Sequence, residues 1–215
     1  MSFAGLLVLV VPMAVISLAI WVLDGPPVVF RQGRIGRHGR LFTICKFRTM
    51  NNAGGSGSTI TAAEDGRVTP LGRRLRRFKL DELPQLWNVL QGDMSFVGPR
   101  PDVPGYLDRL SGDARALWEL RPGITGPATL LFRREEEMLA STKDYVRFND
   151  EVIYPEKVRL NLAYMRQCSF AIDLGYILAT VAPGISRSLG VDRRLALDYA
   201  SFESQMRVSA LKYSS

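Results

Sequence analysis

The chain has 215 residues, of which 47% are hydrophobic, which suits one compact domain with an attached apolar element and excludes two large domains. Its 28 Lys and Arg against 21 Asp and Glu give a net charge of +7, which favours anionic partners: nucleic acid, phosphorylated small molecules or an anionic membrane surface. Two cysteines and one histidine argue against a disulfide framework and a Ser-His-Asp triad, and rule out a multi-histidine metal site.

The first segment is apolar. Residues 3–23 carry no charge, and 21 helical residues would measure about 31 Å, close to one hydrocarbon thickness. A membrane helix is favoured over a buried core helix and over a cleaved signal peptide, because no Lys or Arg precedes it and residues 24–27 form a poor cleavage region. Pro12 predicts a bend, but spanning helices tolerate proline, so spanning and re-entrant paths both stay open.

The flank after this helix is basic, and it predicts that the main domain lies in the cytoplasm. The basic residues are Arg31, Arg34, Arg37, Arg40, Lys46 and Arg48.

Two β-prone runs, 27–30 and 41–47, predict a hairpin with a Gly and Arg-rich turn over 32–40. Residues 51–61 are rich in Gly, Ser, Asn and Thr and predict a loop. A basic helix is predicted over 73–78, with Leu71, Leu75 and Phe78 on one apolar face. Another helix is predicted from Gln85 to Leu90, ending at Gly92.

Further along, the Pro and Gly-dense stretch 95–104 predicts an ordered loop, and 112–120 and 143–168 predict helices. The apolar stretch 170–185 could lie in a membrane interface. The tail 191–215 has an amphipathic pattern that could pack on the domain, on a second copy or on lipid. The expected fold class is α+β, mostly helical with a small β-hairpin. Core candidates in the 143–168 helix are Val152, Val158, Leu160, Leu162 and Met165.

The adjacent acids Asp81 and Glu82 are the main candidates for chemistry. The local pattern alone favours a helix-cap role, because acids in a first helical turn and a proline at an early position both suit the start of a helix. The basic residues around the two acids and the loop 98–101 favour a catalytic role instead. A diphosphate substrate needs such cations, and a carboxylate pair can supply a nucleophile and a metal ligand.

Five segments in one order between residues 24 and 126 resemble the bacterial sugar transferase family, the monotopic phosphoglycosyl transferases. They are Phe30-Arg31-Gln32-Gly33-Arg34-Ile35-Gly36, Lys46-Phe47-Arg48-Thr49-Met50, the eleven residues from Leu80 to Leu90, the ten from Gly92 to Pro101, and Arg121-Pro122-Gly123-Ile124-Thr125-Gly126.

The resemblance implies a re-entrant helix over 1–23, kinked near Pro12, and a catalytic domain with interfacial amphipathic helices over 24–190, facing the cytoplasm at the inner membrane. Residues 191–215 then form a C-terminal extension. It further implies magnesium, and transfer of a phosphosugar from a UDP-sugar to polyprenyl (undecaprenyl) phosphate with release of UMP. Nucleic acid is not an expected partner.

Carried over to this sequence, the resemblance makes Asp81 a nucleophile that carries the phosphosugar, and Glu82 a group that binds or positions Mg²⁺. Arg76 matches a phosphate-binding position. The expected substrate-binding residues are Lys46, Arg48, Arg76, Pro99, Arg100 and Pro101.

The sequence departs from the family pattern at several positions. Val11 precedes the kinking proline where Ser is common, Pro127 and Ala128 replace an aromatic residue and Gln, and Asn161 replaces Asp. These changes predict a subgroup with a different sugar pocket. Members often carry charged residues before the apolar helix, whereas this chain begins almost inside it, which suggests a shortened N-terminus.

Two other classes of function would each explain part of the sequence. A basic membrane-bound nucleic-acid binder would explain the charge and the arginines at 73–77, but no nucleic-acid motif is recognisable. A catalytically dead scaffold is disfavoured by the intact Asp81, Glu82, Arg76 and Arg100. The sequence does not identify the transferred sugar. It also leaves the oligomeric state open between a monomer and a homo-oligomer.

Overall fold

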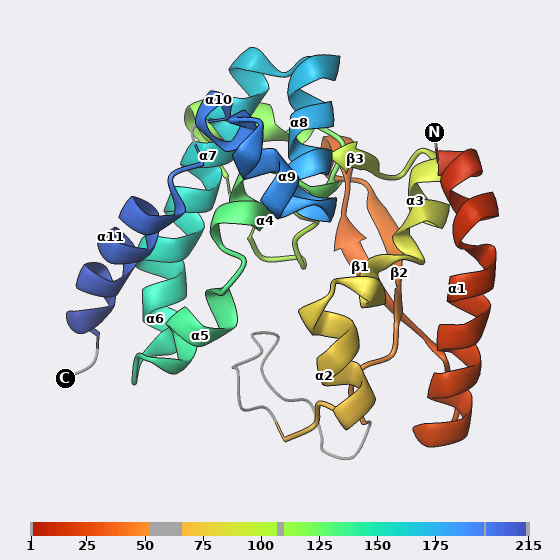
Figure 1. Cartoon of the computed structure of the whole chain (residues 1–215). Helices are drawn as coiled ribbons and strands as arrows, with labels where there is room; N and C mark the ends of the chain where they lie inside the picture. The colour runs from red at the N-terminus through yellow and green to blue at the C-terminus, as the bar shows by residue number, and fades with distance from the viewer. Residues whose placement is uncertain (1, 52–65, 107–109, 196, 214–215) are drawn as a thin grey trace.

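The protein is described from a computed structural model, which covers residues 2–51, 66–106, 110–195 and 197–213. The fold is α+β and mostly helical, as predicted (Figure 1). The N-terminal part contains α1 (Ser2–Leu23), β1 (Val29–Ile35), η1 (Arg37–Gly39), β2 (Leu41–Phe47), α2 (Pro70–Arg77), η2 (Leu80–Glu82), α3 (Gln85–Gln91) and β3 (Ser95–Val97). Then follow η4 (Gly112–Glu119), β4 (Gly123–Thr125), α4 (Pro127–Leu131), α5 (Glu135–Ala140), α6 (Tyr145–Phe148), η5 (Asn149–Ile153), α7 (Tyr154–Gln167), α8 (Phe170–Val181), α9 (Pro183–Ser188), α10 (Val191–Arg194) and α11 (Tyr199–Leu211).

The predicted hairpin is confirmed. Strands β1 and β2 pair antiparallel, from Val29 opposite Phe47 to Ile35 opposite Leu41. The turn is shorter than predicted, because residues 32–35 continue the ladder. His38 takes a left-handed conformation (φ 57°) in the turn, and the Gly36 N–H donates to the Arg40 carbonyl at 2.7 Å. Apart from residue 51, the loop predicted over 51–61 lies outside the described residues.

The stretch 95–104 is not wholly a loop, which corrects the prediction. Its first three residues form β3, which pairs in parallel with β4. The two segments touch at glycines: a Cβ on Gly98 would lie 2.4 Å from the Arg121 carbonyl oxygen, and one on Gly123 would lie 2.1 Å from the Gly98 nitrogen. A three-residue strand is too short for a periodic signal, so its pairing partner appears only in the tertiary structure.

Helix α1 lies along the domain rather than projecting from it. Its less exposed positions are 5, 6, 9, 13, 16, 17, 19 and 20, which cluster on one helix face. That face contacts α3, and the fully buried Ile20 packs with Phe47 and Leu75. The opposite face is apolar and exposed, and Gly5–Leu23 is long and apolar enough to cross a membrane by length and composition. The helix continues through Pro12 without interruption. Figure 1 shows α1 beside α2, α3 and the hairpin.

The predicted basic helix is α2, but its apolar face is narrower than predicted. Leu75 is buried, whereas Phe78 is 67% exposed, because the helix ends at Arg77 and Phe78 lies beyond its last turn. The helix predicted at 85–90 is confirmed as α3, and Gly92 follows it in the left-handed conformation (φ 86°). Residues 112–119 form a 3₁₀ helix.

The predicted helix over 143–168 is helical from Tyr145 to Gln167, with a π-helical segment, η5, between α6 and α7. The five predicted core residues, Val152, Val158, Leu160, Leu162 and Met165, are partly buried, and Val152 and Leu160 pack against the main core. The prediction missed Asn161 and Tyr164, the buried residues of α7, because both carry polar groups that an apolar pattern does not mark. The buried positions of the stretch 145–167 are Phe148, Asn149, Ile153, Asn161 and Tyr164.

The C-terminal residues pack on the domain. The apolar stretch 170–185 forms α8 and the start of α9, which begins at Pro183. Within the tail, Leu197, Phe202, Met206 and Ala210 belong to the main hydrophobic core, and Phe202 meets Phe132 edge to face at 4.8 Å. Of the three alternatives for this tail, packing on the domain is therefore the one that the structure contains.

Candidate active site

Asp81 and Glu82 lie in η2, a single 3₁₀ turn between α2 and α3 (Figure 1). Lys79 before them adopts a left-handed conformation (φ 56°), which reverses the chain after α2 and turns both acids inward. Asp81 is 8% and Glu82 5% exposed. Neither η2 nor α3 has a side-chain cap hydrogen bond, so helix capping does not explain these buried acids.

Glu82 is held by two cations. Its Oε1 accepts hydrogen bonds from Arg100 Nη2 at 2.7 Å and from Lys46 Nζ at 3.2 Å. Burial alone would raise the pKa of Glu82, but the positive charges of Arg100, Lys46 and Lys79 outweigh it and hold that pKa well below its usual range. Burial, followed by the charge of Arg100, lowers the pKa of Lys46 to about 8. The negative charge of Glu82 raises the pKa of Arg100.

Asp81 has the opposite electrostatic environment. Burial, and next the negative charge of Glu82, raise its pKa, while the cations of Lys46, Lys79 and Arg100 only partly oppose them. Its Oδ1 atom is buried without a hydrogen-bond partner among the described atoms. An unsatisfied buried carboxylate oxygen is costly to the fold and available to an incoming ligand. The dyad therefore contains one acid whose Oε1 is bound by two cations, and one acid whose Oδ1 has no partner among the described atoms.

The loop carrying Arg100 is fixed through its backbone. The Gly123 N–H donates to the Pro99 carbonyl at 2.8 Å, and Arg34 Nη1 donates to the Pro101 carbonyl at 3.2 Å. These bonds attach the loop to β4 on one side and to β1 on the other. The two prolines lack N–H groups and enter this network through their carbonyls. The structure thus gives Pro99 and Pro101 a role in holding Arg100.

Two other predicted site residues have their hydrogen-bond and ion-pair partners outside the dyad. Arg76 Nε donates to Thr49 Oγ1 at 2.9 Å, and its Nη1 lies 3.3 Å from Glu136 Oε1 on α5. Arg48 donates to the carbonyls of Asp24, Gly25 and Pro26, directly after α1. Arg48 thus anchors α1 to the domain, a contact that differs from the substrate contact predicted for it.

Sequence reasoning overlooked three polar residues that shape this region. Asn88 is 1% exposed and holds α3 against β2, since its Nδ2 donates to the Thr43 carbonyl at 2.7 Å and its Oδ1 accepts from the Cys45 N–H at 3.1 Å. Thr49 positions Arg76, and Asp102 follows the arginine loop. The sequence offers one signal for Asn88: a polar residue within an apolar helical run indicates a buried hydrogen-bonding side chain.

The dyad offers few ligands to a metal ion. Among the described residues, no group of three or more His, Cys, Asp or Glu could hold one. Both cations bind Glu82 through Oε1, and Asp81 Oδ1 has no hydrogen-bond partner, so carboxylate oxygens remain for a cation. Mg²⁺ is commonly bound by one or two carboxylates, with waters and substrate phosphates completing its octahedron. The residues present therefore fit a Mg²⁺ ion shared with a bound diphosphate.

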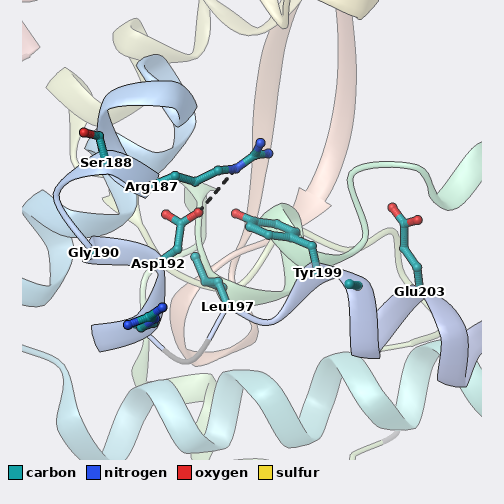
Figure 2. Close-up of a pocket in the computed structure, with 9 residues that line it drawn as sticks. Arg187, Ser188, Gly190, Asp192, Leu197, Tyr199 and Glu203 are labelled. Carbon is teal, nitrogen blue, oxygen red and sulfur yellow. Dashed lines mark ion pairs between the residues drawn. The ribbon is translucent and has the colours of Figure 1, made fainter.

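An open hollow of about 700 Å³ lies away from this chemistry (Figure 2). It is bordered by the ends of α9, α10 and α11, and none of the dyad residues or their cationic partners lines it. Asp192 Oδ1 accepts a hydrogen bond from the Ser186 hydroxyl. Its Oδ2 lies 3.8 Å from Arg187 Nε. The residues drawn in Figure 2 are Arg187, Ser188, Gly190, Asp192, Arg193, Leu197, Tyr199, Ala200 and Glu203.

These features define a class of protein: an apolar helix is fixed to a small α+β domain that holds a buried carboxylate among cations, suited to an anionic substrate at a membrane. Residues 1–187 match the family model described as bacterial sugar transferase. The chain belongs to this family.

Similar proteins carry names that agree with the sugar transferase family. The chain is 37% identical over 157 residues to "Uncharacterized sugar transferase EpsL" of Bacillus subtilis, covering 73% of this chain and 69% of that protein. It is 36% identical over 184 residues to "Undecaprenyl-phosphate glucose phosphotransferase" of Komagataeibacter xylinus, covering 82% and 32%. It is also 36% identical over 174 residues to "UDP-glucose:undecaprenyl-phosphate glucose-1-phosphate transferase" of Xanthomonas campestris, covering 78% and 34%. The chain thus spans about one third of the last two relatives.

Proposed function

We propose that this protein transfers a sugar phosphate from a UDP-sugar to polyprenyl (undecaprenyl) phosphate, releasing UMP, as the first membrane step of glycoconjugate synthesis. The observation that carries the proposal is the dyad: a buried Asp81 with an unpartnered oxygen next to a Glu82 neutralised by Lys46 and Arg100. The names of the relatives from K. xylinus and X. campestris support the substrate classes.

In the first step, a carboxylate oxygen of Asp81 attacks the sugar-linked phosphorus of the donor. A new O–P bond forms, the P–O–P bond breaks, and UMP leaves with the bridging oxygen. The sugar phosphate is then held on Asp81 as an acyl phosphate. Asp81 suits this role because Glu82, rather than Asp81, takes the hydrogen bonds of the adjacent cations, which leaves the Asp81 oxygen free to react.

In the second step, a phosphate oxygen of the polyprenyl phosphate attacks the same phosphorus. The bond to Asp81 breaks, the carboxylate is restored, and a polyprenyl diphosphate sugar results. Two in-line displacements thereby replace a direct encounter between two anionic substrates. Arg100 and Lys46 stabilise the negative charge on the equatorial oxygens in both steps, because they already lie beside the dyad.

Mg²⁺, held by Glu82 and Asp81 together with the donor diphosphate, would spread the diphosphate charge and make UMP a better leaving group. Arg76 binds a phosphate of the donor, and this contact replaces its ion pair with Glu136. Its hydrogen bond to Thr49 holds the guanidinium in place while the partner changes.

We further propose that α1 is re-entrant and that the domain faces the cytoplasm. The support is that α1 contacts the domain from near its start, where a Cβ on Gly5 would lie 3.8 Å from Leu86, to Ile20. A helix crossing the whole bilayer upright would draw the attached α3 into hydrocarbon with it. A helix that returns to the same leaflet keeps α3 near the surface, where Trp87, 51% exposed, suits the interface.

The catalytic proposal is tested by incubating the purified protein with Mg²⁺, polyprenyl phosphate and a panel of UDP-sugars, and measuring UMP. Wild type should release UMP, Asp81→Ala should not, and the exposed-site control Asp113→Asn should match wild type. Phosphosugar should be trapped on wild type when the lipid is omitted. An active Asp81→Ala protein would reject the assigned nucleophile.

The topology is tested with a cysteine at position 2 in a background with Cys45 and Cys168 changed to serine. In sealed vesicles of known orientation, a membrane-impermeant maleimide should label it from the cytoplasmic side. Labelling from the opposite side would reject the re-entrant path.

A further inference from the structure

A second polar cluster borders the dyad on the far side of Arg100. It combines Arg34 of β1, Asp102 of the arginine loop, Glu135 of α5, and Tyr154 and Lys157 of α7. Tyr154 Oη donates to Asp102 Oδ2 at 3.3 Å, and Lys157 Nζ donates to Glu135 Oε1 at 2.6 Å. None of these five residues has a part in the proposed displacement steps.

Asp102 is kept close to the reacting groups by its backbone. Its carbonyl accepts a hydrogen bond from the Ile35 N–H at 2.9 Å, which ties it to the end of β1. It follows Arg100 by two residues, a separation of at most about 7 Å between their Cα atoms. Since Arg100 reaches Glu82 directly, the cluster lies one side chain away from the dyad.

The charges of the cluster balance one another. Arg34 and Lys157 contribute two cations, and Asp102 and Glu135 contribute two carboxylates. The carboxylate of Asp102 interacts with Lys157, Arg34 and Arg100, while burial raises its pKa to about 6, so it remains mainly ionised at neutral pH. A balanced group of donors and acceptors suits a neutral, hydrogen-bonding ligand better than a phosphate, which prefers an excess of cations.

The side chains on the Arg100 side are more exposed than Glu82. Glu82 is 5% and Lys46 17% exposed, whereas Lys157 is 22%, Glu135 27% and Arg100 40% exposed. A ligand with one end at Asp81 therefore has accessible polar side chains on the Arg100 side. There Tyr106 and Tyr154 also present paired rings, 5.0 Å apart, which give the polar groups an apolar neighbour.

The same face of α7 continues to Asn161, seven residues after Tyr154 and about two helical turns away. Asn161 is 7% exposed, and its Oδ1 is buried without a hydrogen-bond partner among the described atoms. This is a second unsatisfied acceptor near the helix face that carries Tyr154 and Lys157.

We propose that Asp102 and Lys157, supported by Tyr154, bind the hydroxyl groups of the donor's sugar and determine which UDP-sugar is used. The proposal rests on the function proposed above, because attack by Asp81 on the sugar-linked phosphorus places the sugar one phosphate away from the dyad. The ionised Asp102 accepts from a sugar hydroxyl and Lys157 donates to one. A site built to bond a hydroxyl discriminates strongly against a ligand that lacks it in that position.

The test compares the best UDP-sugar of the panel with its C4 epimer in wild type, Asp102→Asn and Lys157→Gln. We expect each variant to lower kcat/KM for the best donor by about 10- to 100-fold and to reduce the ratio between the epimers by at least 5-fold. Inhibition by UMP, which lacks the sugar, should stay within twofold of wild type. Glu151→Gln, a carboxylate change at an exposed position of η5, serves as the matched control and should leave the ratio unchanged.

The inference is wrong if kcat/KM falls by the same factor for both epimers in both variants. It is also wrong if inhibition by UMP weakens in parallel with kcat/KM. In either case the cluster has only a structural or general electrostatic role. Melting temperatures of the two variants show whether each is folded, and the inference requires only one folded variant. Failure of the underlying function is recognised separately, because Asp81→Ala would then keep its UMP release.

Discussion

The dyad region and the hollow between α9 and α11 contain the same kinds of side chain, arginines and carboxylates, in different surroundings. At the dyad, Glu82 is 5% exposed and its pKa is held low by Arg100 and Lys46. At the hollow, Arg187 is 67% exposed, and its Nε lies 3.8 Å from Asp192 Oδ2. The ion pair at the hollow is thus longer and more exposed than the ion pairs of Glu82.

The difference shows that burial, more than concavity, prepares charged groups for chemistry. A buried charge interacts strongly with its neighbours because little water screens it, whereas an exposed pair contributes little. The family match ends at residue 187, where the lining of the hollow begins, while all the dyad residues lie within it. The following predictions test this contrast.

The largest effect is expected at Asp81. Asp81→Asn should lower UMP release by at least about 10³-fold, because an amide cannot form the acyl phosphate. The same variant should be more stable by about 1 kcal/mol at neutral pH. The pKa of Asp81 is raised in the folded state, so stability is lost as pH rises through that pKa, and a neutral side chain avoids the loss. UMP release and thermal unfolding measure the two effects; a destabilised variant would contradict the second.

Removing a cation from Glu82 comes next. Arg100→Ala should reduce activity by about 10²- to 10³-fold. It should also destabilise the fold by about 1–3 kcal/mol, because Glu82 stays buried with one cationic partner fewer. The low pKa of Glu82 stabilises the fold fully above its unfolded pKa of 4.5, and this contribution is lost as pH falls from there through the low folded value. The difference in stability between wild type and variant should therefore shrink only in strong acid. Denaturant unfolding at about pH 7 and at about pH 2 checks this.

A smaller effect is expected from Asp102 on stability. Its folded pKa of about 6 exceeds the unfolded value of 3.8, so the folded state binds its proton more tightly and stability falls as pH rises between these values. Asp102→Asn should therefore be more stable than wild type at pH 7.5 by about 1 kcal/mol, or a few °C in Tm, and the advantage should shrink toward pH 5. An equal difference at both values would show that the shift is absent.

The smallest effects are expected at the hollow. Arg187→Ala and Arg193→Ala should change UMP release less than about twofold and stability by less than about 0.5 kcal/mol, since exposed ion pairs contribute little. Their natural comparison is Arg100→Ala in the same assays. A loss of activity above tenfold in either variant would show that the hollow takes part in the reaction, and the contrast between the two regions would not hold.

Much of the architecture could be predicted from sequence, because local signals are strong there. The apolar helix, the hairpin, and α3 with its terminal Gly92 follow from hydropathy, alternation and a left-handed glycine. The ordered motifs likewise singled out Asp81, Glu82, Lys46 and Arg100, which the structure brings together. The buried positions of α7 could not be predicted, because they are Asn161 and Tyr164, whose polar groups an apolar pattern does not mark.

By itself, then, the sequence determined the apolar N-terminal helix, the hairpin and the acidic pair with its basic surroundings. Only the tertiary structure decided that Glu82 takes the cations while an Asp81 oxygen stays unpaired, that Arg48 holds the end of α1, and that Asp102 stands beside Arg34 and Lys157. The reason is physical. These properties depend on burial and on distances between segments far apart in the chain, such as Arg34 and Pro101, which are 67 residues apart. Neither is encoded in the spacing of neighbouring residues.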